Sequence, residues 1–171
     1  MSLSPVIAVR LAGLLAGLSL VAGVAFGAWR VPASPRTAGL DAELRVVGTG
    51  EVGVAPAGAA VRGSGLAAGG PAARGRVRLT NQTAGPLAVA PRVSGGDPAL
   101  DRLVEVELRT AGAVVFRGSL ERLRANSGVA VATLRRGGRR SFELAVRVPS
   151  SAGEDAVAQA GRWTLTFVGA R

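Results

Sequence analysis

The chain of 171 residues has no cysteine, no histidine, no lysine and no tyrosine. Without cysteine it forms no disulfide and offers no thiol nucleophile. Without histidine it lacks the imidazole that general acid–base catalysis and the common zinc sites use, and no lysine can replace it beside a serine or threonine nucleophile. These absences argue against most classes of enzyme, and we expect no catalytic, cofactor-binding or metal-binding residues.

Aromatic residues are also scarce, at 4% of the chain. Because stacking on aromatic side chains supports much single-stranded nucleic-acid binding, we expect no nucleic-acid partner. One sign of charge dominates, with 21 arginines against 11 acidic residues and a formal net charge of +10. That balance suits an anionic partner without naming it. Hydrophobic residues make up 48%, enough for the core of one domain with a short appendage.

Residues 1–33 have the pattern of an export leader. One positive charge, Arg10, precedes the uncharged run Leu11–Trp29, and the small residues place a signal-peptidase cut after Gly27 or after Ala33. The run is also long enough to cross a hydrocarbon core of about 30 Å. The sequence therefore predicts either a cleaved signal peptide or a retained membrane anchor. In both cases the protein is exported, and is secreted or held at the cell surface.

The rest of the chain divides by composition. Residues 34–74 are rich in glycine, proline and alanine and contain one predicted short strand, Ala42–Val47. From residue 75 onward, apolar and polar residues alternate with period two, which is typical of half-buried strands. The clearest runs place these side chains inward: Val77 and Leu79; Val104, Val106 and Leu108; Phe142, Leu144, Val146 and Val148; Trp163, Leu165 and Phe167.

Two short helical segments interrupt the strands. Ser119–Ala125 places two leucines three residues apart. Ser150–Ala160 begins with serine caps and acidic residues and is followed by a glycine. Turn signals every 8–12 residues or so, with no alternation of strands and helices, predict an all-β antiparallel sandwich over residues 75–171. Residues 42–47 are a candidate for its first strand.

Two motifs have ordinary structural interpretations. Gly48–Gly53 matches the GxGxxG of dinucleotide-binding loops. Prolines and glycines follow where the phosphate-binding helix would begin, so we interpret the segment as a flexible loop. Asn81–Thr83 forms a glycosylation sequon, and we interpret Asn81 as a turn former at a strand end.

The densest positive segment is Arg135-Arg136-Gly137-Gly138-Arg139-Arg140. One interpretation is a patch that binds phosphates or an anionic cell-envelope polymer. The other, which we favour, is a solvated hairpin turn whose glycines supply positive φ. No aromatic residue lies within the turn to stack a base.

The carboxylates show no arrangement for catalysis. Glu105 and Glu107 share one strand face and have arginine neighbours in sequence, so we interpret them as solvated charges that balance those arginines. Asp97 and Asp101 supply too few oxygen ligands for a calcium site.

Four segments, in this order, resemble the TasA/camelysin family of exported β-sandwich proteins. Ser64–Gly70 followed by Val77–Asn81 is similar to the family's L-x-P-G … V-x-V-x-N entry, and Val114–Leu120 to its v-y-x-G-x-L segment. Leu134–Pro149 is similar to L-x-x-G-x-s-x-x-y-x-v-x-v-x-L-P, and Ala158–Phe167 to the x-Q-G helix exit and final strand. The resemblance covers residues 64–169, preceded by a leader of the expected type.

The resemblance implies a jelly-roll-like sandwich, export through a signal peptidase and, in some members, assembly into the fibres of an extracellular, biofilm-type matrix. In fibre formers an N-terminal segment adds as a strand to the next subunit. The segment that matches here is Ala42, Glu43, Leu44, Arg45, Val46 and Val47, and its alternative is an ordinary first strand of the same chain. We do not carry over camelysin's metal-dependent peptidase activity, because this chain has no histidine and no zinc-binding helix motif.

The sequence thus predicts a non-enzymatic structural subunit of the cell surface or extracellular matrix. It would self-assemble through edge strands and face an anionic envelope polymer with its arginines. The alternative is a membrane-tethered binding or accessory module, anchored by residues 11–29, with residues 31–74 as a flexible stalk.

Overall fold

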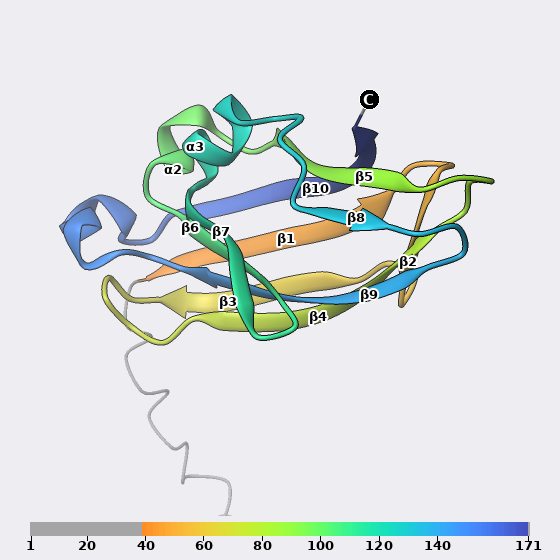
Figure 1. The fold of residues 1–171 in the computed structure, drawn as a ribbon. Coiled ribbons are helices and arrows are strands. Elements are labelled where there is room, and N and C mark those ends of the chain that lie inside the picture. The colour runs from red at the N-terminus through yellow and green to blue at the C-terminus, as the bar shows by residue number, and fades with distance from the viewer. Residues whose placement is uncertain (1–38, 171) are drawn as a thin grey trace, which may run out of the picture. The chain divides into compact units, whose positions relative to one another are not determined.

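The computed structural model describes residues 39–170. The predicted leader, with its apolar run and both cleavage positions, lies outside the described residues. Within them, no helix combines the length and hydrophobicity that crossing a membrane requires. These residues form two five-stranded sheets that enclose one hydrophobic core (Figure 1). The predicted all-β sandwich is confirmed.

Sheet A has the order β3-β1-β10-β5-β8 and sheet B the order β2-β4-β9-β6-β7. The strands of sheet A are β1 (Leu40–Gly48), β3 (Ala60–Leu66), β5 (Leu87–Gly95), β8 (Ala132–Leu134) and β10 (Ala160–Ala170). Those of sheet B are β2 (Val52–Ala55), β4 (Ala73–Asn81), β6 (Glu105–Thr110), β7 (Ala113–Ser119) and β9 (Arg139–Arg147). The helices are α2 (Pro98–Asp101), α3 (Leu120–Ala125) and the 3-10 helix η1 (Ser150–Ala156).

The strands pair in nested order, as in one long hairpin. β6 pairs with β7, β5 with β8 and β4 with β9, all antiparallel, and successive pairs lie in sheets B, A and B. The innermost turn is Ala111–Gly112, where both residues have positive φ (49° and 79°), as a two-residue type I′ hairpin turn requires. Most connections therefore cross from one sheet to the other.

One strand pair departs from the predicted antiparallel sandwich. β1 runs parallel to β10, with Leu44 opposite Trp163 and Val46 opposite Leu165. After β1 the chain crosses to sheet B as β2 and returns as β3 on the outer side of β1, antiparallel to it. β1 thus separates β3 from β10, and the strand that meets β10 runs in the same direction as β10.

The N-terminal segment 34–74 contains more strand than predicted. One short strand was expected, and the described part of the segment holds β1, β2 and β3. Close packing requires small residues here, because a Cβ on Gly63 would lie 2.8 Å from the Leu66 side chain. Such glycines hide the alternation from which strands are recognised. Because Leu40 and Val61 are buried in the core, this part of the segment belongs to the sandwich and is not a flexible stalk.

The predicted core is confirmed. All twelve side chains assigned inward by the alternation are buried: Val77, Leu79, Val104, Val106, Leu108, Phe142, Leu144, Val146, Val148, Trp163, Leu165 and Phe167. Phe142 of sheet B and Phe167 of sheet A meet between the sheets, with ring centroids 5.6 Å apart.

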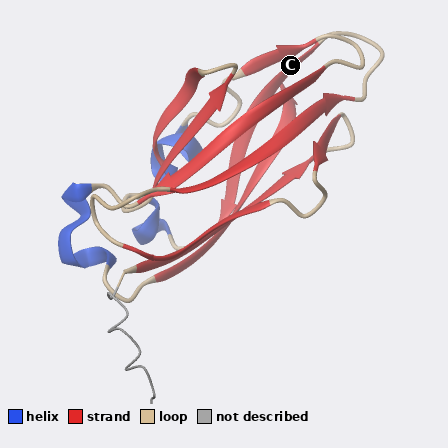
Figure 2. Cartoon of the chain, turned by 90° about the horizontal axis from the view of Figure 1, so that it is seen from below, coloured by secondary structure: helices blue, strands red, loops and turns tan. Residues whose placement is uncertain are grey.

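The helices gather at one end of the sandwich (Figure 2). α3 forms where it was predicted, and the Ser119 hydroxyl caps it by accepting from the Arg122 N–H at 3.1 Å. The helix predicted over Ser150–Ala160 is shorter: it is the 3-10 helix η1, without a side-chain cap. Its regularity is broken at Gly153, whose φ of 53° and ψ of −138° are not helical.

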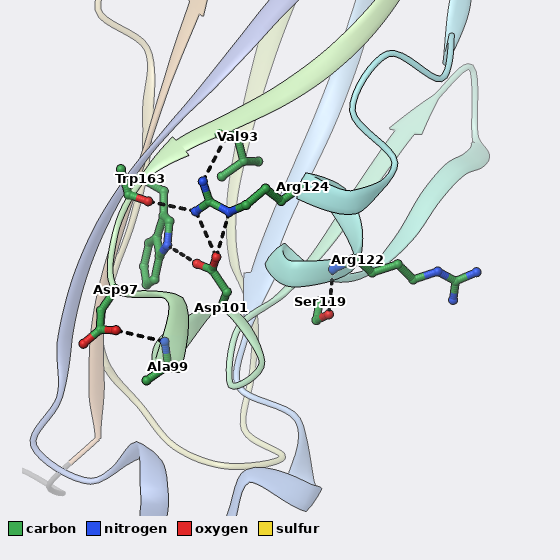
Figure 3. A network of polar contacts seen from close by, with 9 residues as sticks. Val93, Asp97, Ala99, Asp101, Ser119, Arg122, Arg124 and Trp163 are labelled. Carbon is green, nitrogen blue, oxygen red and sulfur yellow. Dashed lines mark hydrogen bonds and ion pairs between the residues drawn. The ribbon is translucent and has the colours of Figure 1, made fainter.

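A buried polar cluster ties this end together (Figure 3). The side chain of Asp101 is only 3% exposed. It accepts from Trp163 Nε1 at 2.7 Å and from Arg124 Nε at 2.9 Å. Arg124 also donates to the carbonyls of Val93 and Gly95. The cluster therefore joins α2 and α3 to β5 and β10, and its polar groups are used within the fold.

Candidate functional site

The outward side of sheet B carries ten charged side chains, and we call it the arginine face. Alternation along each strand buries the apolar residues and turns the charged ones outward. Seven arginines and three glutamates leave a surplus of four positive charges: Arg74, Arg76 and Arg78 on β4, Arg139, Glu143 and Arg147 on β9, Glu105, Glu107 and Arg109 on β6, and Arg117 on β7. The outward side of sheet A has a surplus of only two, from Arg45, Arg62, Arg92 and Arg162 against Asp41 and Glu43.

Each glutamate of the arginine face pairs with arginine across the strands. Glu143 contacts Arg76 at 2.5 Å, and Arg147 Nε donates to Glu105 at 2.7 Å. Glu107 is shared, because one of its oxygens accepts from Arg109 and the other from Arg117 Nε at 2.6 Å. The prediction that Glu105 and Glu107 balance arginines is confirmed, but the two side chains are less solvated than predicted, at 27% and 17% exposed. The partner of Glu105 is also not a neighbour in sequence, because Arg147 comes from β9.

Glu107 is the most constrained of these carboxylates, with a side chain 17% exposed. The hydrogen bond from Arg109, helped by the bond from Arg117 and by both charges, holds the pKa of the Glu107 carboxyl below its ordinary value of 4.5, although partial burial alone would raise it. Glu107 is therefore ionised at neutral pH and neutralises part of the charge of two arginines.

Three arginines of the face make no ion pair with any residue that the structure describes. They are Arg74, Arg78 and Arg139, all exposed. Arg74 and Arg78 lie on the same strand with the paired Arg76 between them, and alternate residues of a strand are about 7 Å apart. Arg139 continues the row, because it stands opposite Thr80 in the next strand. The surplus charge is therefore concentrated along β4 and the start of β9.

A hollow lies in the middle of the face. Ala145 stands between Arg74 on β4 and Glu107 on β6, and its methyl group leaves space where the neighbouring side chains are long. The hollow has a volume of about 460 Å³, and its lining includes Arg74, Arg76, Glu107, Arg109, Glu143 and Ala145. It therefore gives an anionic group access to Arg74 from the middle of the sheet.

The segment Arg135–Arg140 lies beside this row and forms the predicted turn. All four arginines are exposed, and Gly137 has the positive φ (63°) that was expected. The turn is not a hairpin, because β8 belongs to sheet A and β9 to sheet B. Arg139 belongs to both the turn and the arginine face, so the predicted patch is one end of a larger basic surface.

Asn81 holds this turn in place. Its side-chain amide donates to the carbonyls of Gly85, Leu134 and Arg135 at 2.7–3.1 Å, and its oxygen accepts from the backbone and hydroxyl of Thr83. The residue is 2% exposed, so the amide that glycosylation would modify is buried and fully used. The interpretation of Asn81 as a turn former is confirmed.

The other predicted features have ordinary places in the fold. Gly48–Gly53 joins β1 to β2, with no helix after it. Residues 42–47 lie in β1, which is hydrogen-bonded to β3 on one side and β10 on the other. Within the described part of the chain, no three histidine, cysteine, aspartate or glutamate residues lie close enough together to hold a metal ion.

The sequence alone indicates only one corner of the basic surface, the segment Arg135–Arg140. Arg74, Arg109, Arg117 and Arg147 were not singled out, because they are far apart in the sequence and meet only through the pairing of β4, β9, β6 and β7. The pattern that could have indicated this surface is the alternation along β4, in which each of the outward positions 74, 76 and 78 is an arginine.

No family model and no curated protein matches the chain. Among solved structures, the N-terminal domain of PorA is similar over 77% of this chain and 87% of that domain, with 10% sequence identity and a TM-score of 0.29. Similarity at this level supports no argument about function. The resemblance to the TasA/camelysin family therefore stays a prediction from the sequence.

Proposed function

We propose that this protein is a non-enzymatic binding module of the cell envelope, which holds a linear anionic polymer on its arginine face. The observation that carries the proposal is the row Arg74, Arg78 and Arg139, whose charges no described carboxylate neutralises. Arginine presents a planar fork of donors that matches carboxylate and phosphate oxygens. A row of such groups on a rigid sheet suits a repeating anion.

The distribution of charge supports binding by one face. Ion pairs join Arg76, Arg109, Arg117 and Arg147 to the three glutamates, so that the positive charge without an ion pair is concentrated on the remaining arginines of the same face. Binding by surface charge falls as salt rises, because the polymer releases its counterions when arginines replace them. We expect the affinity to decrease steeply with salt.

The fold and location that we propose agree with this role. The nested antiparallel pairs, which alternate between the sheets, support the jelly-roll-like arrangement that the sequence predicts, and the parallel pair β1–β10 departs from it. The leader predicted over residues 1–33 would bring the domain outside the membrane. If the leader stays uncleaved, the module is tethered by residues 11–29; if it is removed, the module is secreted.

A structural subunit remains the second candidate. In its predicted form, residues 42–47 would pass to the next subunit, yet they occupy a central place in sheet A with a partner strand on each side. Exchange would require both pairings to be broken. Polymer binding is therefore the first candidate function, and assembly contacts are expected at surfaces other than residues 42–47.

The test compares two double variants. Arg74→Gln with Arg78→Gln removes two charges from the arginine face, and Arg45→Gln with Arg92→Gln removes two exposed arginines from the outward side of sheet A. The probes are poly(glycerol phosphate) and poly-glutamate, which separate phosphodiester from carboxylate recognition. Binding is measured by fluorescence anisotropy from about 50 to 200 mM salt, because affinity for a polyanion falls by orders of magnitude over this range.

We expect the β4 variant to lose at least about tenfold in affinity and about 1.4–1.8 units of the log–log salt slope, since each of the two contacts contributes about 0.7–0.9. The sheet A variant should change affinity by less than about threefold. Equal losses in the two variants would mean that only net charge matters, and would contradict the proposal. So would a failure of both polymers to bind at 50 mM salt.

A further inference from the structure

Exposed apolar side chains are few in the described chain, and their positions are informative. Large hydrophobic residues are exposed at only three described positions: Val114 (43%), Val129 (61%) and Val157 (43%). Val129 lines a groove, and Val157 follows the 3-10 helix η1. Single exposed apolar residues are common, so the neighbours of these two residues decide whether they matter.

The groove lies between β7, α3 and the segment that connects α3 to β8. It has a volume of about 280 Å³, and its apolar lining comprises Pro91, Val115, Phe116, Leu123, Val129 and Val131. β8 begins only at Ala132, so Val129 and Val131 come before the strand. The preceding residues therefore form an irregular wall, in which Val129 is left exposed.

The edge of the groove is positively charged. Arg117 and Arg122 line it together with Asn126. Arg117 is paired with Glu107, whereas the guanidinium of Arg122 extends away from the fold (Figure 3) and makes no ion pair with a described residue. Glu121 precedes Arg122 on α3 but does not line the groove. The groove thus combines an apolar floor with a cation that forms no ion pair within residues 39–170.

The segment after β9 has the opposite character, and we call residues 153–159 the acidic loop. Ala152 and Ala156 are buried and fix it to the core. Between and after them, Glu154, Asp155 and Val157 are exposed. Neither Glu154 nor Asp155 forms an ion pair with any described residue, although arginines outnumber acids in this chain. The acidic loop therefore presents two free carboxylates beside an exposed valine.

We propose that the groove is the docking site for the acidic loop of a second copy of this chain. Val157 would enter the apolar groove beside Val129, and Glu154 or Asp155 would pair with Arg122 at its edge. Hydrophobicity and charge correspond in the two surfaces, and the helices α3 and η1, beside which they lie, are at the end of the sandwich where the helices gather (Figure 2). The small contact area makes the single contact weak. Copies bound along one polymer would strengthen it through their high local concentration.

The absence of cysteine from the chain allows a direct test by disulfide trapping in the full-length protein. Chains carrying Val129→Cys are mixed with chains carrying Val157→Cys under mild oxidation, without polymer, and the heterodimer is quantified on a non-reducing gel. The matched control replaces Val157→Cys by Ala57→Cys, in an exposed turn after β2. We expect the 129–157 disulfide to form at least about tenfold faster than the 129–57 disulfide.

Charge reversal then tests the ion pair. Arg122→Glu in the Val129→Cys chain should slow trapping by at least about fivefold, and Glu154→Arg with Asp155→Arg in the Val157→Cys chain should restore it. Glu121→Arg, a reversal at the neighbouring residue outside the groove, should leave the rate within about twofold. Equal trapping at 157 and 57 would overturn the proposal, as would a reversal at 122 without effect. Because no polymer is present, neither outcome bears on the polymer-binding function.

Discussion

The cluster around Asp101 and the arginine face use the same residue types in opposite ways. Asp101 is almost completely buried, and its partner Arg124 donates its remaining hydrogen bonds to backbone carbonyls. On the arginine face Glu107 also serves two partners, but the arginines around it are exposed and outnumber the carboxylates. The first cluster uses its charges to hold elements of the fold together. The second leaves arginines without an ion pair among the described residues, and is the surface for which we propose binding.

The largest effect that separates the two regions should come from Asp101→Ala. The substitution leaves the buried Trp163 N–H without its acceptor and removes the carboxylate that pairs with the partly exposed Arg124, and we expect a loss of about 3 kcal/mol in the free energy of unfolding. Asp101→Asn keeps an oxygen for Trp163 and should cost less. Urea denaturation followed by tryptophan fluorescence measures both variants. A loss below about 1 kcal/mol for the alanine variant would mean that the cluster is not structural.

An intermediate effect on stability is expected for Asn81→Ala. This variant tests whether the buried Asn81 amide mainly stabilises the fold or mainly supports polymer binding by the basic turn. The variant leaves the carbonyls of Leu134 and Arg135 without this donor, and we expect a loss of about 2 kcal/mol. Hydrogen exchange should show faster exchange in residues 81–86 and 135–138. Polymer affinity should fall less than in the variant with Arg74→Gln and Arg78→Gln. A larger fall would show that the order of the turn dominates binding.

The sequence predicted the parts of the fold that depend on local pattern. Alternation identified the inward residues of β4, β6, β9 and β10, and turn chemistry identified the Arg135–Arg140 turn. In each case the signal lies within a few neighbouring residues, where the side-chain period of a strand or the positive φ of a turn operates.

Features that depend on distant pairing could not be predicted in this way. The parallel contact of β1 with β10 joins the two ends of the described chain. Asp101 and Trp163 are 62 residues apart, and the arginine face exists only because β4, β9 and β6 are neighbours. The segment Arg135–Arg140 can be recognised from the sequence because its charges are consecutive. Arg74 cannot, because the charged residues around it come from other strands.

The smallest effect on stability should come from Glu107→Gln. This substitution should lower stability but raise polymer affinity. The substitution weakens the pairing with Arg109 and Arg117, so we expect a loss of about 0.5 kcal/mol at neutral pH. It also frees one positive charge on the arginine face, so polymer affinity should rise about twofold or more. Glu154→Gln, at an exposed carboxylate without an ion pair among the described residues, should leave stability unchanged.

The pH dependence makes this test specific. Because the pKa of Glu107 is lower in the folded chain than its ordinary value of 4.5, its ionised form stabilises the fold above that pH, and this contribution disappears as the pH falls through the folded pKa. The difference in unfolding free energy between the original chain and Glu107→Gln should therefore be constant from pH 7 to about 5 and shrink as the pH falls below 4.5. If the difference does not shrink at all as the pH is lowered further, packing of the side chain and not its charge explains the effect. The ion pairs of Glu107 would then contribute little to the stability of the fold.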